Sequence, residues 1–288
     1  MPSTSLVEPL LKSLYLLATM VEARDPYTGG HLWRVSQFAR TVAIDMDLPD
    51  ADIARITLGG FLHDLGKIGV PDAILNKRDK LSDDEYAVIK THPDIGARLL
   101  SAHPLSSMVL AAVVQHHETP DGRGYPAGLK GSEIALDARI VGVCDAFDAM
   151  SSSRPYRAGM PLDKVLGIIE ANLGSQFCPE AGSRLLRLGQ GGALNHIIGH
   201  SESGIPLQAC PGCHAPIAVR RQQLNGGALF CRACAGESEL IVEDGLPRIS
   251  LTGRVGNARQ LEADIDELLI GELVGEASRH LDLAGFAA

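Results

Sequence analysis

The sequence reads Phe61-Leu-His-Asp-Leu-Gly-Lys-Ile-Gly-Val-Pro71, so that a histidine–aspartate pair directly follows apolar residues. Apolar side chains recur at helical spacing through 53–68, and we expect this segment to form one helix. On that helix His63 and Asp64 lie about 100° apart, close enough to converge on one metal ion. Lys67 follows Asp64 by three residues, which places its ammonium group on the same face, where it can bind a phosphate oxygen.

Further residues of the metal-binding type occur on both sides of this pair. They are His31, His92, His116, His117 and Asp145. Imidazole and carboxylate groups are ligands of borderline and hard divalent cations, and one carboxylate can bridge two ions. The inventory therefore predicts a metal centre with room for two ions and, with Lys67 beside it, a hydrolase that acts on phosphate esters.

Composition excludes several classes of protein. The 288-residue chain has a formal net charge of −9, which argues against coating of nucleic acid or anionic lipid by bulk charge. The apolar run near the N-terminus contains Glu8 and Lys12 and lacks a preceding basic stretch, so it does not read as a signal peptide. No stretch reaches about 18 uncharged apolar residues, the length needed to cross a bilayer. We therefore expect a cytoplasmic protein without a membrane segment.

Changes in pattern divide the chain into four parts. Residues 1–190 have apolar side chains at three- and four-residue spacing and predict a mainly α domain. Gly, Ser, His and Asn dominate 191–207, which we expect to be a linker. A four-cysteine module follows at 208–250, and 251–288 predict an amphipathic C-terminal helix that either packs on the body or forms a dimer contact. The apolar stripe of this helix would consist of Leu261, Ile265, Leu268, Leu269 and Leu273.

One helix boundary bears on the metal ligands. Ser82 and Glu85 have the spacing of a capping box, which predicts the start of a helix. We expect this helix to end at His92, because Pro93 follows it. That interpretation places His92 at the C-terminus of a helix.

Four of the six cysteines form two Cys-x2-Cys pairs. Cys210 and Cys213 make the first pair and Cys231 and Cys234 the second, with 17 residues between the pairs. Four thiolates can hold a tetrahedral zinc ion and leave no open position, so we predict a zinc ribbon with a structural zinc that supplies folding energy. Its few arginines favour contact with a protein over binding of nucleic acid. We expect the two remaining cysteines to be buried thiols.

Several motifs, taken together, resemble one known family. They are Asp25-Pro-Tyr-Thr-Gly-Gly-His31, the stretch around His63-Asp64, Ile74-Leu-Asn-Lys, His92-Pro-Asp-Ile-Gly, His116-His-Glu followed by Asp121-Gly-Arg-Gly-Tyr-Pro, and Asp145-Ala-Phe-Asp-Ala-Met. In this order they resemble the HD-GYP family of cyclic-di-GMP phosphodiesterases, within the HD metal-dependent phosphohydrolase superfamily, over residues 15–185. The resemblance implies an HD-type helical bundle for this part of the chain.

The resemblance also implies a centre of two divalent metal ions. The first ion would be held by His31, His63, Asp64 and Asp145. Asp64 would bridge to the second ion, which would also be held by His92, His116 and His117. A hydroxide that bridges the two ions would be the nucleophile, with Asp64 and Lys67 as the catalytic residues.

Substrate contacts follow from the same resemblance. Arg154 and Arg157 match basic positions that bind the phosphates of the substrate, and a guanidinium fork suits that task. Gly124, Tyr125 and Pro126 match the Gly-Tyr-Pro stretch and are predicted to bind substrate as well.

One position departs from the pattern of some family members. They carry a glutamate four residues before the first histidine as a ligand of a third ion, whereas Tyr27 stands there in this chain. We therefore predict two ions, although Glu22 or Asp25 leaves a third ion open. Several relatives in this family use iron or manganese, so we expect one of these metals. Ligation by histidine and aspartate also admits nickel or zinc.

The leading functional hypothesis is hydrolysis of cyclic di-GMP to linear pGpG, with further hydrolysis to GMP left open. A second hypothesis keeps the site but changes the substrate to another cyclic dinucleotide or a nucleotide. A third is a scaffold that binds the dinucleotide with little turnover. The predicted partners are a cyclic dinucleotide, a protein that contacts the zinc ribbon or the C-terminal helix, and a second copy of the chain, but neither a membrane nor extended nucleic acid.

Overall fold

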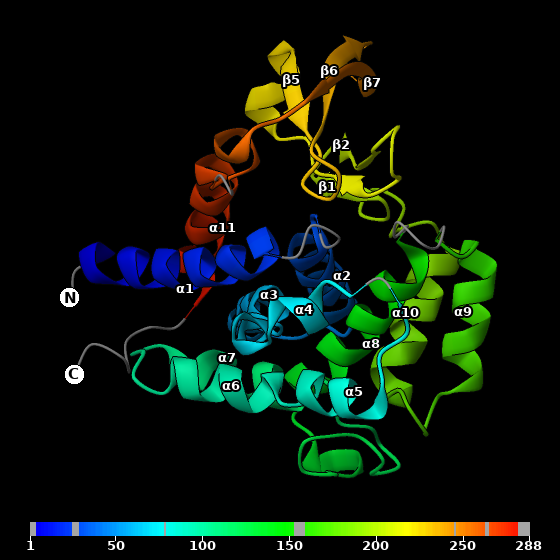
Figure 1. The fold of residues 1–288 in the computed structure, drawn as a ribbon. Coiled ribbons are helices and arrows are strands. Elements are labelled where there is room, and N and C mark those ends of the chain that lie inside the picture. The colour runs from blue at the N-terminus through cyan, green and yellow to red at the C-terminus, as the bar shows by residue number, and fades with distance from the viewer. Residues whose placement is uncertain are drawn as a thin grey trace.

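The structure is a computed structural model that describes residues 4–24, 29–77, 79–152, 159–244, 246–262 and 265–281. Helices form the larger part, and a small β unit lies above them in Figure 1. The α-helices are α1 (Thr4–Arg24), α2 (His31–Asp45), α3 (Asp50–Leu62), α4 (Asp72–Leu75), α5 (Asp83–Ile89), α6 (His92–Leu100), α7 (Ser106–Gln115), α8 (Leu136–Ser151), α9 (Leu162–Ala171), α10 (Pro179–Gln190) and α11 (Glu267–His280). Short 3-10 helices are η1 (Leu65–Gly69), η2 (Gly131–Glu133), η3 (Arg221–Asn225) and η4 (Ala258–Leu261). The predicted mainly helical fold with a small β part and a terminal helix is confirmed.

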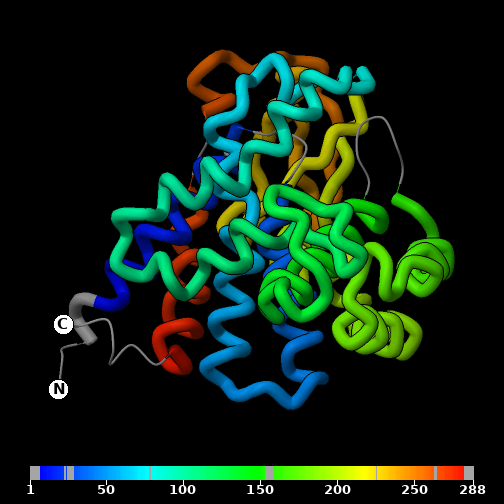
Figure 2. The backbone as a smooth tube through the Cα atoms, turned by 90° about the horizontal axis from the view of Figure 1, so that it is seen from below, coloured from blue at the N-terminus to red at the C-terminus, as the bar shows by residue number. Residues whose placement is uncertain are grey.

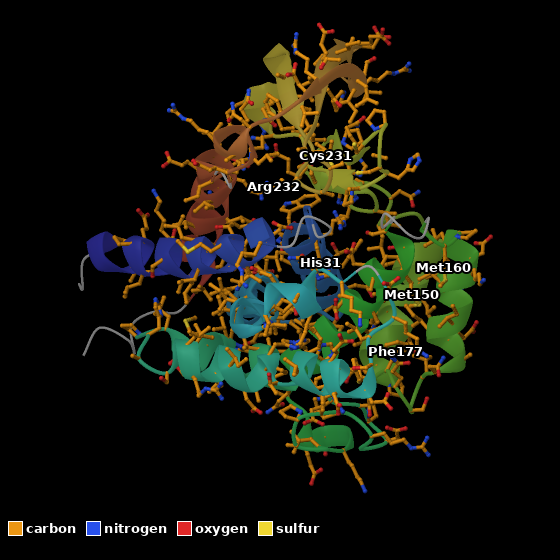
Figure 3. All side chains as sticks on the ribbon, viewed as in Figure 1. His31, Met150, Met160, Phe177, Cys231 and Arg232 are labelled. Atoms are coloured by element: carbon orange, nitrogen blue, oxygen red, sulfur yellow. The ribbon has the colours of Figure 1, made fainter. Side chains whose placement is uncertain are left out.

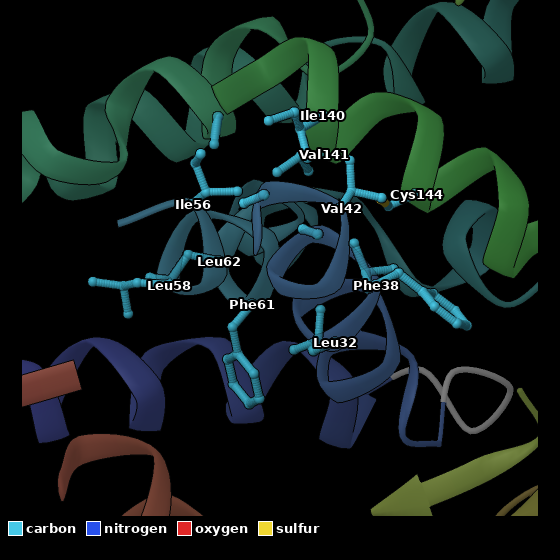
Figure 4. Close-up of a cluster of buried hydrophobic side chains, with 14 of the residues drawn as sticks. Leu32, Phe38, Val42, Ile56, Leu58, Phe61, Leu62, Ile140, Val141 and Cys144 are labelled. Atoms are coloured by element: carbon cyan, nitrogen blue, oxygen red, sulfur yellow. The ribbon is translucent and has the colours of Figure 1, made fainter. Parts of the chain in front are cut away.

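The core of the helical part lies where α2, α3 and α8 meet, as Figure 4 shows. Phe38 of α2 packs edge-to-face on Phe147 of α8, with 5.0 Å between ring centroids. Phe61 of α3 makes the same type of contact with Tyr15 of α1, also at 5.0 Å. Each such ring is almost completely buried, and truncation of a buried phenylalanine typically costs about 3–5 kcal/mol. Several of the predicted metal ligands lie at the ends of these packed helices.

Two predicted helix boundaries were wrong. Segment 53–68 is not one helix, because α3 ends at Leu62 and the chain turns at His63 and Asp64 before η1 begins. The capping box at Ser82 and Glu85 is confirmed, but α5 ends at Ile89 and His92 is the first residue of α6. Proline is well tolerated in the first turn of a helix, where its missing N–H leaves no bond unmade, so Pro93 starts α6 rather than ending α5.

The β unit consists of three small antiparallel sheets among the described residues. Its strands are β1 (His200–Glu202), β2 (Ile205–Pro206), β3 (Gln208–Ala209), β4 (Pro216–Ile217), β5 (Gly227–Phe230), β6 (Gly236–Glu243) and β7 (Leu246–Val255). β1 pairs with β2, β3 with β4, and β5, β6 and β7 form one sheet in that order. Strand β1 contacts α2, which joins the β unit to the helical part.

Segment 191–207, predicted to be a linker, contributes to both parts. Leu194 and Ile197 are fully buried in the helical core. The strands β1 and β2 follow within the same segment. The division of the chain into domains remains a prediction.

The C-terminal helix is shorter than predicted, because residues 246–255 belong to β7 and the helix begins only at Glu267. Asp266 caps it by accepting the backbone N–H of Leu269 at 3.1 Å. Its buried side chains are Ile270, Leu273, Val274 and Ala277. Helix α11 lies beside α1 in both views (Figure 1 and Figure 2), so its apolar face packs on the body. No helix in the described part of the chain is long and apolar enough to span a membrane.

Candidate metal centre

The predicted metal ligands come from the ends of four helices and from one helix interior. His31 is the first residue of α2, and His63 and Asp64 follow the last residue of α3. His92 is the first residue of α6, while His116 and His117 directly follow α7. Asp145 lies within α8. Ligand atoms of His31, His63 and Asp64, which we call the first group, lie within 4.8 Å of one another. Those of His92, His116 and His117, the second group, lie equally close together.

Asp64 faces both groups of ligands, one oxygen to each. Its Oδ2 lies 3.4 Å from Nε2 of His63 and 3.6 Å from Nε2 of His31. Its Oδ1 lies 3.5 Å from Nε2 of His92. Asp145 completes the first group, with Oδ1 at 3.5 Å from Nε2 of His31. The structure therefore brings all seven predicted ligands together, with Asp64 in the bridging position.

Backbone contacts leave the Nε2 atoms of the buried histidines free to bind metal. Nδ1 of His63 lies 2.7 Å from the carbonyl oxygen of Gly60, and Nδ1 of His92 lies 2.8 Å from that of Ile89. His116 has the same arrangement with carbonyls of α7. A carbonyl can only accept, so each Nδ1 carries the proton and each Nε2 carries a lone pair.

The lone pairs fit a bound cation. Nε2 of His63 is buried and has no hydrogen-bond partner among the described residues. Nε2 of His92 and Nε2 of His116 lie only 3.2 Å apart, an unfavourable approach of two lone pairs unless a positive charge binds both. The donor set of imidazoles and carboxylates is one that divalent transition metals take.

Burial and charge set the protonation of the ligands. Burial lowers the pKa of His92 and His116, and it lowers the pKa of His117 to about 4. Burial also acts to raise the pKa of Asp64, but Lys67 and the neighbouring histidines outweigh it and hold this pKa well below its usual range. At neutral pH the three histidines of the second group are therefore neutral, and the carboxylate of Asp64 beside them is ionised. These are the forms that bind metal.

Asp148 of α8 is buried and orients His31. Its Oδ2 lies 2.7 Å from Nδ1 of His31. Arg34 binds the same carboxylate through two nitrogens, and Ser152 donates its hydroxyl to Oδ1 at 3.0 Å. A carboxylate behind a histidine ligand fixes the ring and the tautomer of that ligand. Sequence reasoning missed Arg34, whose only signal was its position one helical turn after His31.

Two side chains of the centre are partly exposed in the described part of the chain, whereas the histidines beside them are buried. His63 and His92 are completely buried and His31 is 4% exposed. The side chains of Lys67 and Asp145 are 24% and 20% exposed, respectively. Nζ of Lys67 lies 2.6 Å from Oδ2 of Asp64, in agreement with its predicted place beside the ligands. Lys67 and Asp145 thus mark the more exposed side of the centre.

Two glycines allow the ligand-bearing segments to approach. A Cβ atom on Gly66 would lie 1.8 Å from the carbonyl oxygen of His92, and one on Gly142 would lie 2.5 Å from that of His116. Any larger residue would separate η1 from α6, or α8 from the end of α7. The relative positions of Asp64, His92 and His116 depend on these two contacts.

The loop that contains Gly124, Tyr125 and Pro126 packs directly on the centre. The ring of Tyr125 stacks on that of His117, with centroids 4.7 Å apart. A Cβ on Gly124 would lie 2.5 Å from the backbone of 117–119, so only glycine fits there. Glu118, which carried no predicted role, fixes the loop by accepting the backbone N–H groups of Ala127, Gly128 and Leu129.

Several predicted site residues lie outside the described residues. These are Arg154, Arg157, Asp25 and Tyr27. Glu22, the other candidate for a third ion, belongs to neither group of converging ligands in the described part of the chain. Its carboxylate instead accepts backbone N–H groups of His31 and Leu32 at the start of α2.

The four predicted zinc ligands also converge. Sulfur atoms of Cys210, Cys213, Cys231 and Cys234 all lie within 4.8 Å of one another, and none forms a disulfide. The two pairs form matching turns: the residue after each pair, His214 or Ala235, has a φ of 60° and donates its N–H to the carbonyl of the first cysteine. Two such turns that face each other suit a tetrahedral ion. The single cysteines, Cys144 and Cys178, are buried as predicted.

Comparisons with known proteins show which sequences this chain is similar to. A family model described as HD domain matches residues 15–180. The chain is 42% identical over 178 residues to the cyclic di-GMP phosphodiesterase response regulator RpfG of Xanthomonas campestris, covering 61% of this chain and 47% of that protein. It is 41% identical over 162 residues to 3'3'-cGAMP-specific phosphodiesterase 3 of Vibrio cholerae, covering 56% of this chain and 35% of that protein. It is 38% identical over 181 residues to a cyclic di-GMP phosphodiesterase of Thermotoga maritima, covering 62% and 49%. The chain thus spans half or less of the length of these relatives.

Proposed function

Because this chain belongs to the HD domain family, we propose that it is a metal-dependent phosphodiesterase that hydrolyses cyclic di-GMP to linear pGpG. The family match and the relatives named cyclic di-GMP phosphodiesterases confirm the resemblance inferred from the motifs. The observation that carries the proposal is the position of Asp64, whose two oxygens face two separate groups of histidines. A carboxylate in this position is what a centre of two ions requires.

The chain's own residues prepare the site for this reaction. Two bound divalent cations would polarise the phosphate and lower the pKa of a water molecule. His31, His63, Asp64 and Asp145 would hold one cation, and Asp64 with His92, His116 and His117 would hold the other. Lys67 places a positive charge on the more exposed side, where it can stabilise negative charge that develops on the phosphate.

Residues on the more exposed side would position the dinucleotide. Tyr125 covers one face of His117 and offers an aromatic surface beside the reacting phosphate, with Gly124 and Pro126 shaping the loop. We assign phosphate binding to Arg154 and Arg157. Hydrolysis of 3'3'-cGAMP is the second candidate reaction, favoured by the 41% identical relative from Vibrio cholerae.

The cofactors follow from the donor types. Imidazole and carboxylate ligands favour iron or manganese at the centre, with nickel or zinc as alternatives, and four thiolates favour zinc at the cysteines. The four-cysteine unit would be structural and would contact a protein partner. A cytoplasmic location and a homodimer complete the proposal.

The decisive experiment measures products. Protein purified without oxygen is loaded with iron or with manganese and incubated with cyclic di-GMP or with 3'3'-cGAMP, and the products are separated by chromatography. We expect pGpG from cyclic di-GMP, no product with Asp64→Ala, and normal product with Asp163→Ala, which changes an exposed aspartate of α9. Turnover of 3'3'-cGAMP alone would change the assigned substrate, and a metal-loaded protein that hydrolyses neither would refute the proposal.

A further inference from the structure

A cavity lies between the helical part and the β unit. Its volume is about 520 Å³, within the range of roughly 300–1,000 Å³ that is typical of small-molecule sites. Glu22 of α1 and Trp33 of α2 line it from the helical side. Glu202 of β1 and Arg232, which Figure 3 labels next to Cys231, line it from the β unit. None of the seven predicted metal ligands lines this cavity, which adjoins the metal centre only through Glu22, the acceptor of the backbone N–H of His31.

Two buried carboxylates in the cavity wall have an acceptor to spare. Glu202 is only 3% exposed, and its Oε2 binds Arg221 at 3.2 Å. Its Oε1 is buried and has no partner among the described residues. Oε1 of Glu22 is likewise buried and without a partner in the part of the chain that the structure describes. Leaving a buried acceptor without a donor is unfavourable, because its hydrogen bonds to water are lost and not replaced. A ligand that brings N–H groups into the cavity would remove this cost.

The same wall carries cationic and aromatic side chains. Arg220, Arg232 and Arg259 line the cavity together with the acidic pair. Guanidinium groups bind phosphate through paired N–H donors. Phe230, which is half-buried, also lines it and offers a ring on which a base can stack, and the edge of the buried Trp33 adjoins the same wall. The occupant must therefore combine N–H donors, a flat ring and an anionic group.

Among nucleobases, guanine meets the requirement for donors best. Its ring N–H and its amino group are adjacent, so that both can donate to the unpaired Oε1 of Glu202, whereas adenine offers only its amino group. We propose that this cavity binds a guanine mononucleotide, with Glu202 and Glu22 as acceptors for the base and ribose and the arginines as donors to the phosphate. This site does not depend on the phosphodiesterase reaction, and its test does not measure hydrolysis.

Trp33 provides the readout, because it is the single tryptophan of the chain and lines the cavity. Full-length, metal-loaded protein is titrated with GMP, AMP and inorganic phosphate while tryptophan fluorescence is recorded. We expect a saturable change with GMP, binding of AMP weaker by roughly tenfold, and no saturation with phosphate in the same range. Equal affinity for GMP and AMP, or the absence of any saturable change, would overturn the proposal.

Three variants locate the binding event. Glu202→Gln replaces one acceptor by an N–H₂ group, and we expect GMP affinity to fall by roughly tenfold or more. Ala228→Phe adds bulk to the exposed cavity wall without removing a hydrogen bond, and should weaken GMP binding as well. Glu239→Gln changes an exposed glutamate of β6 that does not line the cavity and should leave binding unchanged. If GMP binds all three variants like the unmodified protein, it binds elsewhere and the assignment is wrong.

Discussion

Arg34 and Asp148 form a buried bidentate ion pair behind His31, one of the predicted metal ligands. Nε of Arg34 lies 2.6 Å from Oδ1 of Asp148, and Nη2 lies 3.0 Å from Oδ2. Nη1 of Arg34 also donates to the carbonyl oxygen of His200 in β1 at 2.9 Å. This arginine therefore connects the carboxylate that orients a metal ligand with the first strand of the β unit.

We expect Arg34→Ala to lower both stability and metal content. The change leaves Asp148 buried without its cationic partner, and loss of one partner of a buried pair typically costs about 3–5 kcal/mol. His31 would lose its fixed orientation, so metal bound at the first group of ligands should fall. Urea unfolding and elemental analysis of the purified protein measure the two effects.

The matched control is Arg187→Ala, which removes an arginine from an exposed ion pair with Asp45. Exposed pairs contribute little because water screens them, so we expect stability and metal content close to those of the unmodified protein. If Arg34→Ala retained full metal content, the proposed role of the Arg34–Asp148 pair in positioning His31 would be refuted.

Metal stoichiometry tests the bridging position of Asp64. We expect two ions at the centre of the unmodified protein in addition to the zinc at the cysteines. Asp64→Ala should lose both ions, because Asp64 faces both groups, whereas His117→Ala should lose one. Elemental analysis with protein quantified by absorbance distinguishes these outcomes. Retention of one ion by Asp64→Ala would show that the carboxylate belongs to a single ion.

The sequence predicted which side chains gather at the candidate centre better than it predicted the elements that carry them. All seven predicted ligands lie together, because residue types that can bind metal are few and occur here in recognisable motifs. The boundaries at His63 and His92 were missed because helical periodicity does not reveal where a chain turns. The turn after Leu62 accompanies the contact of Gly66 with the carbonyl of His92, a tertiary contact that local sequence does not encode.

Supporting residues were harder to predict than ligands. Arg34 acts through contacts with residues 114 and 166 positions away in the sequence. Glu118 was part of a recognised motif, yet its role depends on where the loop after it folds back. The long strand β7 was assigned in part to the terminal helix, since its sequence mixes apolar and polar residues without clear alternation. Such assignments require the three-dimensional arrangement.

The stability of the protein without bound metal should fall as the pH rises from about 6.5 to 9. Burial acts to lower the pKa of His31, but hydrogen bonds to Asp148 and Asp64 outweigh it and raise this pKa to about 9. A raised pKa in the folded state stabilises the protein fully below the unfolded value of about 6.5, and this contribution disappears as the pH rises through the folded value. The loss would be at most about 3 kcal/mol.

Urea unfolding at a series of pH values, in the presence of a chelator, measures this dependence. The His31→Gln variant lacks the titrating ring and should show a flatter profile over the same range. Bound metal replaces the proton on His31, so the metal-loaded protein should also lack the slope. If the free energy of unfolding depended equally on pH in the unmodified protein and in the variant, a group other than His31 would be responsible.

The four-cysteine cluster should be needed for the fold of the β unit. We expect Cys234→Ser to lose the zinc and to make residues 208–255 sensitive to protease, because so small a unit depends on its metal for folding energy. The control, Cys178→Ser, changes a single buried cysteine of the helical part and should retain the zinc. Elemental analysis and mass spectrometry of limited digests compare the two. Zinc retained by Cys234→Ser would mean that another ligand takes part.

Gly66→Ala tests whether close packing sets the distance between Asp64 and His92. A Cβ atom at Gly66 would lie 1.8 Å from the carbonyl oxygen of His92, so η1 and α6 must separate. We expect lower stability and loss of metal from the second group, in which His92 takes part. Gly271→Ala makes the same chemical change in α11, where a Cβ atom would contact nothing within 4 Å. There, the higher helix propensity of alanine should raise stability by up to about 1 kcal/mol. Urea unfolding and metal analysis are used to compare the two variants. Unchanged metal binding in Gly66→Ala would show that the centre tolerates movement of η1.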